Sequence, residues 1–313
     1  MTVGFLRANE NMPIVTDSRL NSEADIKFET YRGYLDAVRR HIYQTYGSWK
    51  HFGRTCIDQT LHMQGIGVFD QPWVERFLKI AWNTEFILSD GAKDVELVRI
   101  NNQWSPIQAY YAIYACGEAL AYVLDGNKAD GHQKTLTKLT DYFEKNSLSP
   151  WNLSYEGPRG RTCQDHKPHN FSADIRIPHN LQRSDVTPQE LIAKCLKAEH
   201  ANRVDDTWQK RRCQFKYNFD PGRTSLLHFM YRLRIKSNYK EIDLFVSQAP
   251  AAKILNFNTS LQYICFYTLL YMEVALARKC KKSFLLALGD KYLTVNPRAH
   301  KLKRRLEFYN SQI

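Results

Sequence analysis

Apolar residues along most of this chain recur at intervals of three and four positions, and few segments alternate apolar with polar residues. This spacing is typical of α-helices and differs from the period of two expected for half-buried strands. We therefore predict an all-α protein. With 313 residues, of which 43% are hydrophobic, the chain is long enough to bury one large core or two smaller ones.

Two helices are predicted before residue 100. The first runs from about residue 26 to 46 and ends at Gly47. The second begins at Pro72, since proline is favoured in the first turn of a helix. Residues 1–24 show little pattern, so we expect residues 1–100 to form an arm followed by helices that pack on a core.

The next two helices carry the clearest signals. One is predicted over residues 105–125, with Ser105 as its N-cap, and its apolar spacing places Tyr111 and Tyr114 on the buried stripe. The other is predicted over residues 132–145, with its leucine and phenylalanine side chains facing inward. Together they indicate a helical hairpin.

Residues 101–150, which contain this hairpin, are expected to form the first half of one bundle. Residues 151–222 are richer in proline and poorer in large aliphatic residues, and we interpret them as an insertion between core helices. Within them Thr187 and Glu190 have the spacing of a capping box, which predicts a helix over residues 188–202.

Residues 223–313 are expected to form the second half of the bundle. A short helix is predicted over residues 225–234 and a long one over residues 250–280. The stretch 261–277 is apolar except for three positions, one of which is Glu273. It is at the short limit for a membrane span, so we interpret it as the buried central helix and expect no membrane association.

Positive charge is concentrated near the C-terminus. The net charge is +12, and residues 278–305 hold ten basic residues against one acid, Asp290. Such clustering is typical of proteins that bind a polyphosphate, whereas an ordinary solvated helix face is the alternative. We expect nucleic-acid contacts from Lys301, Lys303, Arg304 and Arg305.

The seven cysteines are odd in number and include no Cys-x-x-Cys pair, which indicates a reducing compartment. Because the first residues also lack a basic segment followed by an apolar run, we expect a cytoplasmic protein. Cys163, His166 and His169 could bind zinc with Cys213 or His179 as a further ligand. Their spacing does not match that of structural zinc sites, so we predict no metal.

Four segments in a fixed order resemble the HEPN superfamily of small helical bundles, many of which are ribonucleases or toxins. They are the tyrosine-rich helix start at 105–116, the Gly-His-Gln-Lys start at 131–136, the Arg-x-x-x-Asn-Tyr motif at 234–239 and a final long helix. The resemblance is carried by residues 103–146 and 224–277. It implies an RNA-binding bundle of a microbial defence or toxin type.

In that family an arginine is followed after four to six residues by a histidine, and two such motifs face each other in a homodimer. RNA is cut without a metal or other cofactor: the 2′-hydroxyl attacks the adjacent phosphate, histidine moves protons and arginine stabilises the phosphoryl transition state. Arginine suits this role because it stays charged and presents a fork of donors to phosphate oxygens. A histidine near its own pKa can act as base or acid.

The resemblance assigns the catalytic arginine to Arg234, but the histidine position holds Tyr239, or Asn238 if the register moves by one. This pattern resembles a branch of the family whose nuclease activity is not assured. Tyrosine is a poor base at neutral pH unless a cation lowers its pKa. Arg232 and Lys236 are cations of the same segment, and we also expect them to contact nucleic acid.

Two further histidines are candidates for a role in function. His228 lies six residues before Arg234 on the same predicted helix and could enter the same cleft, or it could simply pack in the core. His132 begins a predicted helix, where it could be structural or could contact a phosphate.

Three functional hypotheses follow. The first is an RNA-binding protein that cleaves RNA with Arg234. The second is a non-catalytic module for dimerisation or for docking to a protein partner encoded nearby; neutral surroundings for Arg234, or its burial against a carboxylate such as Asp243, would favour it. The third is a toxin regulated by nucleotidyl transfer, which needs Tyr239 exposed as the acceptor.

Overall fold

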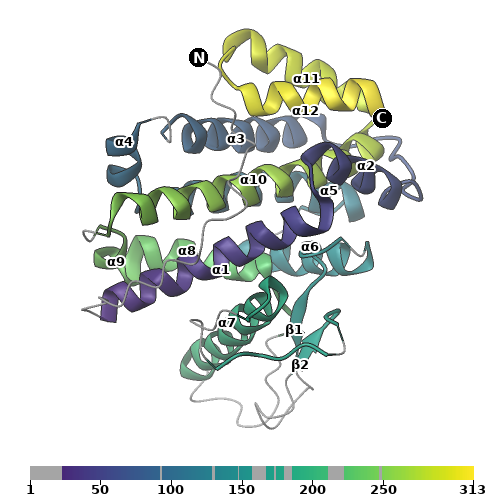
Figure 1. Ribbon diagram of the computed structural model, residues 1–313. Coiled ribbons are helices and arrows are strands. Elements are labelled where there is room, and N and C mark those ends of the chain that lie inside the picture. Colours follow the sequence, from purple (N-terminus) through teal and green to yellow (C-terminus); the bar gives the residue numbers. More distant parts are fainter. Residues whose placement is uncertain are drawn as a thin grey trace.

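The computed structural model describes residues 23–91, 94–128, 131–146, 148–156, 167–172, 174–179, 185–210, 222–246 and 249–313. Most of these residues are helical, and the strands among them form one small sheet of three strands. The prediction of an all-α protein is therefore confirmed. The helices pack as a bundle with the sheet at one end (Figure 1).

Helix α10 (Ala251–Cys280) is the centre of the bundle. Among the described residues it is the one helix long and apolar enough to cross a membrane, and 94% of its apolar window is buried inside the protein. This confirms the prediction of a buried central helix. The helices in contact with it are α1 (Glu23–Tyr46), α2 (Trp49–Gln59), α3 (Gln71–Asp90), α4 (Val95–Ile100), α5 (Ser105–Asp125), α11 (Lys282–Val295) and α12 (His300–Gln312).

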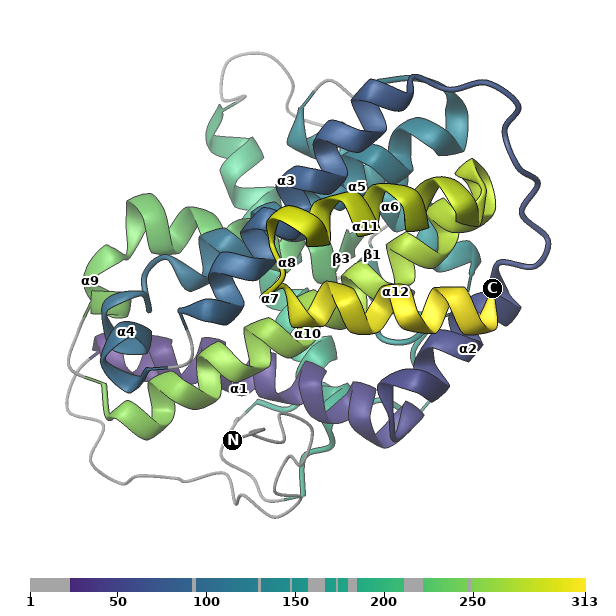
Figure 2. The same ribbon diagram turned by 90° about the horizontal axis from the view of Figure 1, so that it is seen from above.

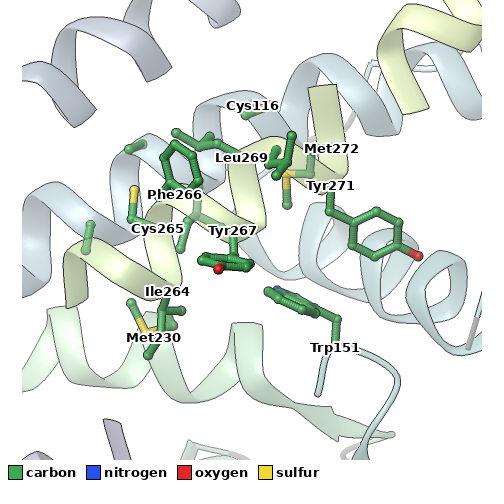
Figure 3. Packing of buried hydrophobic residues seen from close by; sticks show 14 of the residues in the cluster. Cys116, Trp151, Met230, Ile264, Cys265, Phe266, Tyr267, Leu269, Tyr271 and Met272 are labelled. Carbon is green, nitrogen blue, oxygen red and sulfur yellow. The ribbon is translucent and has the colours of Figure 1, made fainter. Parts of the chain in front are cut away.

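Aromatic side chains fill the space around α10 (Figure 3). The ring of Tyr267 lies 5.0 Å from that of Phe52 on α2, measured between centroids. Trp151 packs beside it and donates its Nε1–H to Thr268 Oγ1 at 2.9 Å. Aromatic residues make up 13% of the sequence, and this core accounts for part of them.

The helical hairpin has nearly the predicted limits. Helix α5 ends at Gly126, whose φ of +77° suits glycine, and α6 spans His132–Lys145. Ser105 is not the N-cap, however: it is the first helical residue and donates to Asn101 O at 3.0 Å. The predicted buried stripe was also wrong for Tyr111 and Tyr114, which are half-buried.

Helix α7 (Pro188–Lys210) begins with the predicted capping box. The Thr187 backbone N–H donates to Glu190 Oε2 at 2.8 Å, and the Glu190 N–H donates to Thr187 Oγ1 at 3.2 Å. The helix runs beyond the predicted end at residue 202. The strands β1 (Ser154–Glu156), β2 (Lys167–His169) and β3 (Thr224–Ser225) pair antiparallel in the order β2-β1-β3.

Strand β3 leads directly into α8 (Leu226–Ile235), which continues as the π-helix η2 (Lys236–Lys240) and the short α9 (Ile242–Val246). Helix α5 packs against α10, α8 and α6. The four core helices predicted from the sequence therefore pack together as one bundle.

Seen from above, α11 and α12 lie side by side over α10 (Figure 2). Arg305 on α12 fixes this helix there, since its side chain is fully buried between two carboxylates. Its Nη1 and Nη2 bond to Glu85 at 2.7 Å, and its Nε bonds to Glu273 Oε2 at 2.8 Å. Glu273 also accepts hydrogen bonds from Arg305 Nη2 at 3.0 Å, Trp82 Nε1 at 2.8 Å and Tyr309 Oη at 2.6 Å.

We expect Arg305→Met to destabilise the protein by about 3–5 kcal/mol, because it leaves two buried carboxylates without their cation. The neighbouring Arg304 is exposed, so Arg304→Met removes the same charge and should change stability by about 0.5 kcal/mol or less. Urea denaturation of both variants measures the difference. Equal effects would show that the buried ion pairs do not hold α12 in place.

Candidate functional site: Arg234 among tyrosines

Arg234 lies in the last turn of α8, at the point where α8, α5 and α6 meet. The π-helix that follows it widens the backbone directly after Arg234, and such insertions are common at functional sites. The group that surrounds the guanidinium is called here the Arg234 site, and it comprises Arg234, Tyr110, Tyr111, Tyr114, His132 and Tyr231.

The Arg234 guanidinium is enclosed by aromatic rings. Its Cζ lies 5.1 Å from the ring centroid of Tyr111, 5.7 Å from that of Tyr231 and 5.9 Å from that of Tyr110. Its Nη2 donates to Tyr111 Oη at 2.5 Å. Cation–π contacts of this kind stabilise a guanidinium by about 0.5–1 kcal/mol each when partly exposed. The tyrosines therefore hold the cation in place without neutralising it.

Arg234 forms no ion pair with any residue in the described part of the chain, and its buried Nε has no hydrogen-bond partner there. Asp243, the carboxylate considered from the sequence, is exposed and does not pair with it. The surroundings of Arg234 are neutral, which meets one of the two conditions favouring the non-catalytic hypothesis. The same neutrality leaves its charge available to an anion.

His132, the first residue of α6, completes the Arg234 site from the other side. Its Nδ1 lies 2.7 Å from Tyr110 Oη. Its ring centroid is 4.1 Å from that of Tyr114 and 5.5 Å from that of Tyr231. Burial and the charge of Arg234 lower the pKa of His132 below its usual value, so its imidazole is neutral at pH 7.

The motif residues after Arg234 lie at the rim. Tyr239 is 67% exposed, with its ring centroid 6.0 Å from Arg234 Cζ, and Asn238 is half-buried. An exposed aromatic ring beside a cation is suited to stacking on a base. Tyr239 is also accessible enough for the third hypothesis.

His228 is not part of this site, and the prediction that it is catalytic was wrong. Its side chain is 2% exposed, and its Nδ1 accepts a hydrogen bond from the Ser225 backbone N–H at 3.2 Å. It thereby caps α8 at the end opposite Arg234. Burial lowers the pKa of His228 far below its usual value, which keeps it neutral.

Arg232 and Lys236, expected to contact nucleic acid, already have carboxylate partners. Arg232 Nε donates to Glu199 Oε1 at 2.8 Å, and Lys236 Nζ donates to Glu241 Oε1 at 2.8 Å. Both side chains are largely buried. Their charges are compensated within the protein, which argues against the predicted role for both.

The basic C-terminal segment contains both side chains with partners inside the protein and exposed side chains. Arg305 is buried between Glu85 and Glu273, so the prediction that it binds nucleic acid was wrong. Lys301 is half-buried and donates to Gln262 Oε1 at 3.0 Å, which argues against its predicted contact. Lys303 and Arg304 are exposed on α12, and their contacts with nucleic acid stay a prediction.

Helix α12 and α8, the helix that carries Arg234, lie on opposite sides of α10 (Figure 1). A nucleic acid would therefore have to pass around the bundle to reach both surfaces. This separation makes the Arg234 site and α12 two independent candidates for contact with phosphate.

The zinc candidates cannot be joined into a site. Cys163, His166 and Cys213 lie outside the described residues, whereas His169 and His179 lie within them. Among the residues that the structure describes, no group of three histidine, cysteine or acidic side chains could hold a metal ion.

Sequence reasoning did not assign His132 or the tyrosines to the site, although the signal was present. Tyr110, Tyr111 and Tyr114 fall in the tyrosine-rich helix start, and His132 opens the next helix after a short loop. A helical hairpin brings the start of its second helix near the end of its first, yet here His132 reaches back to the middle of α5, at Tyr110 and Tyr114. That displacement depends on the loop and could not be predicted.

No family model matches the chain, and no match was found among the curated proteins or the solved structures. Any functional conclusion therefore depends on the geometry of the Arg234 site together with the resemblance in its motifs.

Proposed function

We propose that the chain is a HEPN-like RNA-binding protein of a microbial defence or toxin type, and that it cleaves RNA without a metal. The observation that carries this proposal is the uncompensated, half-buried guanidinium of Arg234. In our proposal it contacts the scissile phosphate and stabilises the charge that develops there. Two copies in a cytoplasmic homodimer would present two such arginines.

The chemistry of the Arg234 site supports a phosphodiester as its ligand. A phosphodiester carries one negative charge, and a guanidinium can donate two parallel hydrogen bonds to its oxygens. The Tyr111 hydroxyl, which now accepts from Arg234, can reorient and donate to the same phosphate. Tyr239, exposed at the rim, can stack on a flanking base.

A non-catalytic docking module is the second candidate, and a specific observation favours it. The surroundings of Arg234 are neutral, and the motif holds Asn238 and Tyr239 where active members of the family carry histidine. In this alternative Arg234 would bind an acidic segment of a protein partner encoded nearby.

We expect Arg234→Ala to reduce RNA cleavage by ~100-fold or more, because it removes an electrostatic donor from the transition state. Arg234→Lys keeps the charge but loses the fork and should be intermediate. The matched control is Arg40→Ala: Arg40 is also half-buried but is paired with Asp36 at 3.0 Å, so its loss should leave cleavage unchanged. Chelators should not inhibit.

Cleavage of labelled RNA and filter binding, measured on the same preparations, separate the hypotheses. If the wild type binds RNA but never cuts it, the non-catalytic module is favoured. If Arg234→Ala unfolds the protein, shown by its melting curve, Arg234 is a structural residue and the proposal fails.

The second prediction concerns α12. Lys303→Gln combined with Arg304→Gln should weaken RNA binding and reduce the slope of log Kd against log salt by up to ~2 units, if both residues touch phosphates. The charge-matched control replaces Lys27 and Arg40, which have carboxylate partners. If the Lys303 and Arg304 variant has the same salt slope as the control variant, the exposed face of α12 is an ordinary solvated face.

A further inference from the structure

The motif that carries Arg234 lacks a histidine, but the fold brings one to it from a different helix. His132 and Arg234 approach the same three rings. The Tyr110 centroid is 5.6 Å from the His132 centroid and 5.9 Å from Arg234 Cζ. The corresponding distances are 5.5 Å and 5.7 Å for Tyr231, and 6.1 Å and 5.1 Å for Tyr111. A single chain thus holds an imidazole and a guanidinium in one site, and the guanidinium has no carboxylate partner among the described residues.

The hydrogen bond at Nδ1 leaves the other nitrogen of His132 available. Nδ1 lies 2.7 Å from Tyr110 Oη, and Nε2 has no hydrogen bond to the described residues. When Nδ1 carries the proton and donates it to Tyr110, Nε2 keeps its lone pair and can accept a proton. The contact with Tyr114 fixes the plane of the ring.

We propose that His132 is the general base of the Arg234 site, replacing the histidine that the motif lacks. This inference rests on the proposed function. In the reaction, His132 Nε2 takes the proton of the RNA 2′-hydroxyl, and the 2′-oxygen forms a bond to phosphorus while the bond from phosphorus to the 5′-oxygen breaks. The products are a 2′,3′-cyclic phosphate and a 5′-hydroxyl, whose proton comes from solvent water.

The groups that face His132 favour a neutral imidazole. From α5 they are Tyr110, Tyr111 and Tyr114, and from α8 they are Tyr231 and the cation Arg234. The carboxylate of Glu118, also on α5, is buried and accepts a hydrogen bond from Thr135 Oγ1. A base of this kind remains unprotonated at neutral pH and loses activity only on acidification.

The decisive variant is His132→Gln, which keeps a polar side chain but cannot take a proton. We expect single-turnover cleavage at saturating RNA to fall by ~100-fold or more, with RNA affinity changed by about twofold or less. The acid limb of the pH profile should disappear with the histidine. The matched control is His51→Gln, an exposed histidine on α2, which should cleave as the wild type does.

A second measurement does not depend on activity. In an NMR titration of the imidazoles, the pKa of His132 should lie below the ordinary value of histidine, and Arg234→Gln should raise it because a nearby cation is removed. An RNA with a 2′-deoxy sugar at the scissile position should bind without being cut.

The outcomes separate the two proposals. If the wild type cuts RNA and His132→Gln cuts it at the same rate with the same pH profile, His132 is not the base, while the proposed function stands. If the wild type binds RNA but cuts none, both proposals of catalysis fail. If the pKa of His132 has the ordinary value of histidine and does not change in Arg234→Gln, the two groups do not share a site in solution and the inference is overturned.

Discussion

A single carboxylate in the buried central helix constrains much of this fold. Glu273 lies in the C-terminal half of α10 and is fully buried. An unpaired charge at such a position would cost several kcal/mol, so the chain must supply a cation to it. Arg305 does so from α12 and also pairs with Glu85 on α3. The position of α12, the last helix, therefore depends on the charge of Glu273 in α10.

This pairing also explains why the basic C-terminal segment could not be interpreted from charge alone. Leu302, Leu306 and Tyr309 are buried at helical spacing, and Arg305 falls on the same face of α12. Composition counts Arg304 and Arg305 alike, but only Arg304 faces solvent. The apolar stripe would have identified the difference, whereas net charge conceals it.

Local signals predicted the helices well and the site poorly. Capping by Thr187 and Glu190, and the stop at Gly126, depend on neighbouring residues and were correct. His228 was predicted to lie in the site because of its distance from Arg234 along one helix. Its side chain instead caps the helix, because it accepts a hydrogen bond from the backbone N–H of Ser225, three residues before it. The meeting of His132 with Tyr110 depends on how two helices and a loop pack, and no spacing within one helix contains that information.

Three arginines of this chain show why Arg234 is the one suited to bind an anion. Arg305 is fully buried and has two carboxylates, and Arg232 is largely buried and has Glu199. Arg234 is half-buried, and among the described residues its guanidinium contacts aromatic rings and a tyrosine hydroxyl but no carboxylate. A carboxylate partner cancels the charge of an arginine, whereas aromatic rings stabilise the cation and leave its net charge intact. In the proposed function, the rings around Arg234 therefore preserve a positive charge that a phosphate can neutralise.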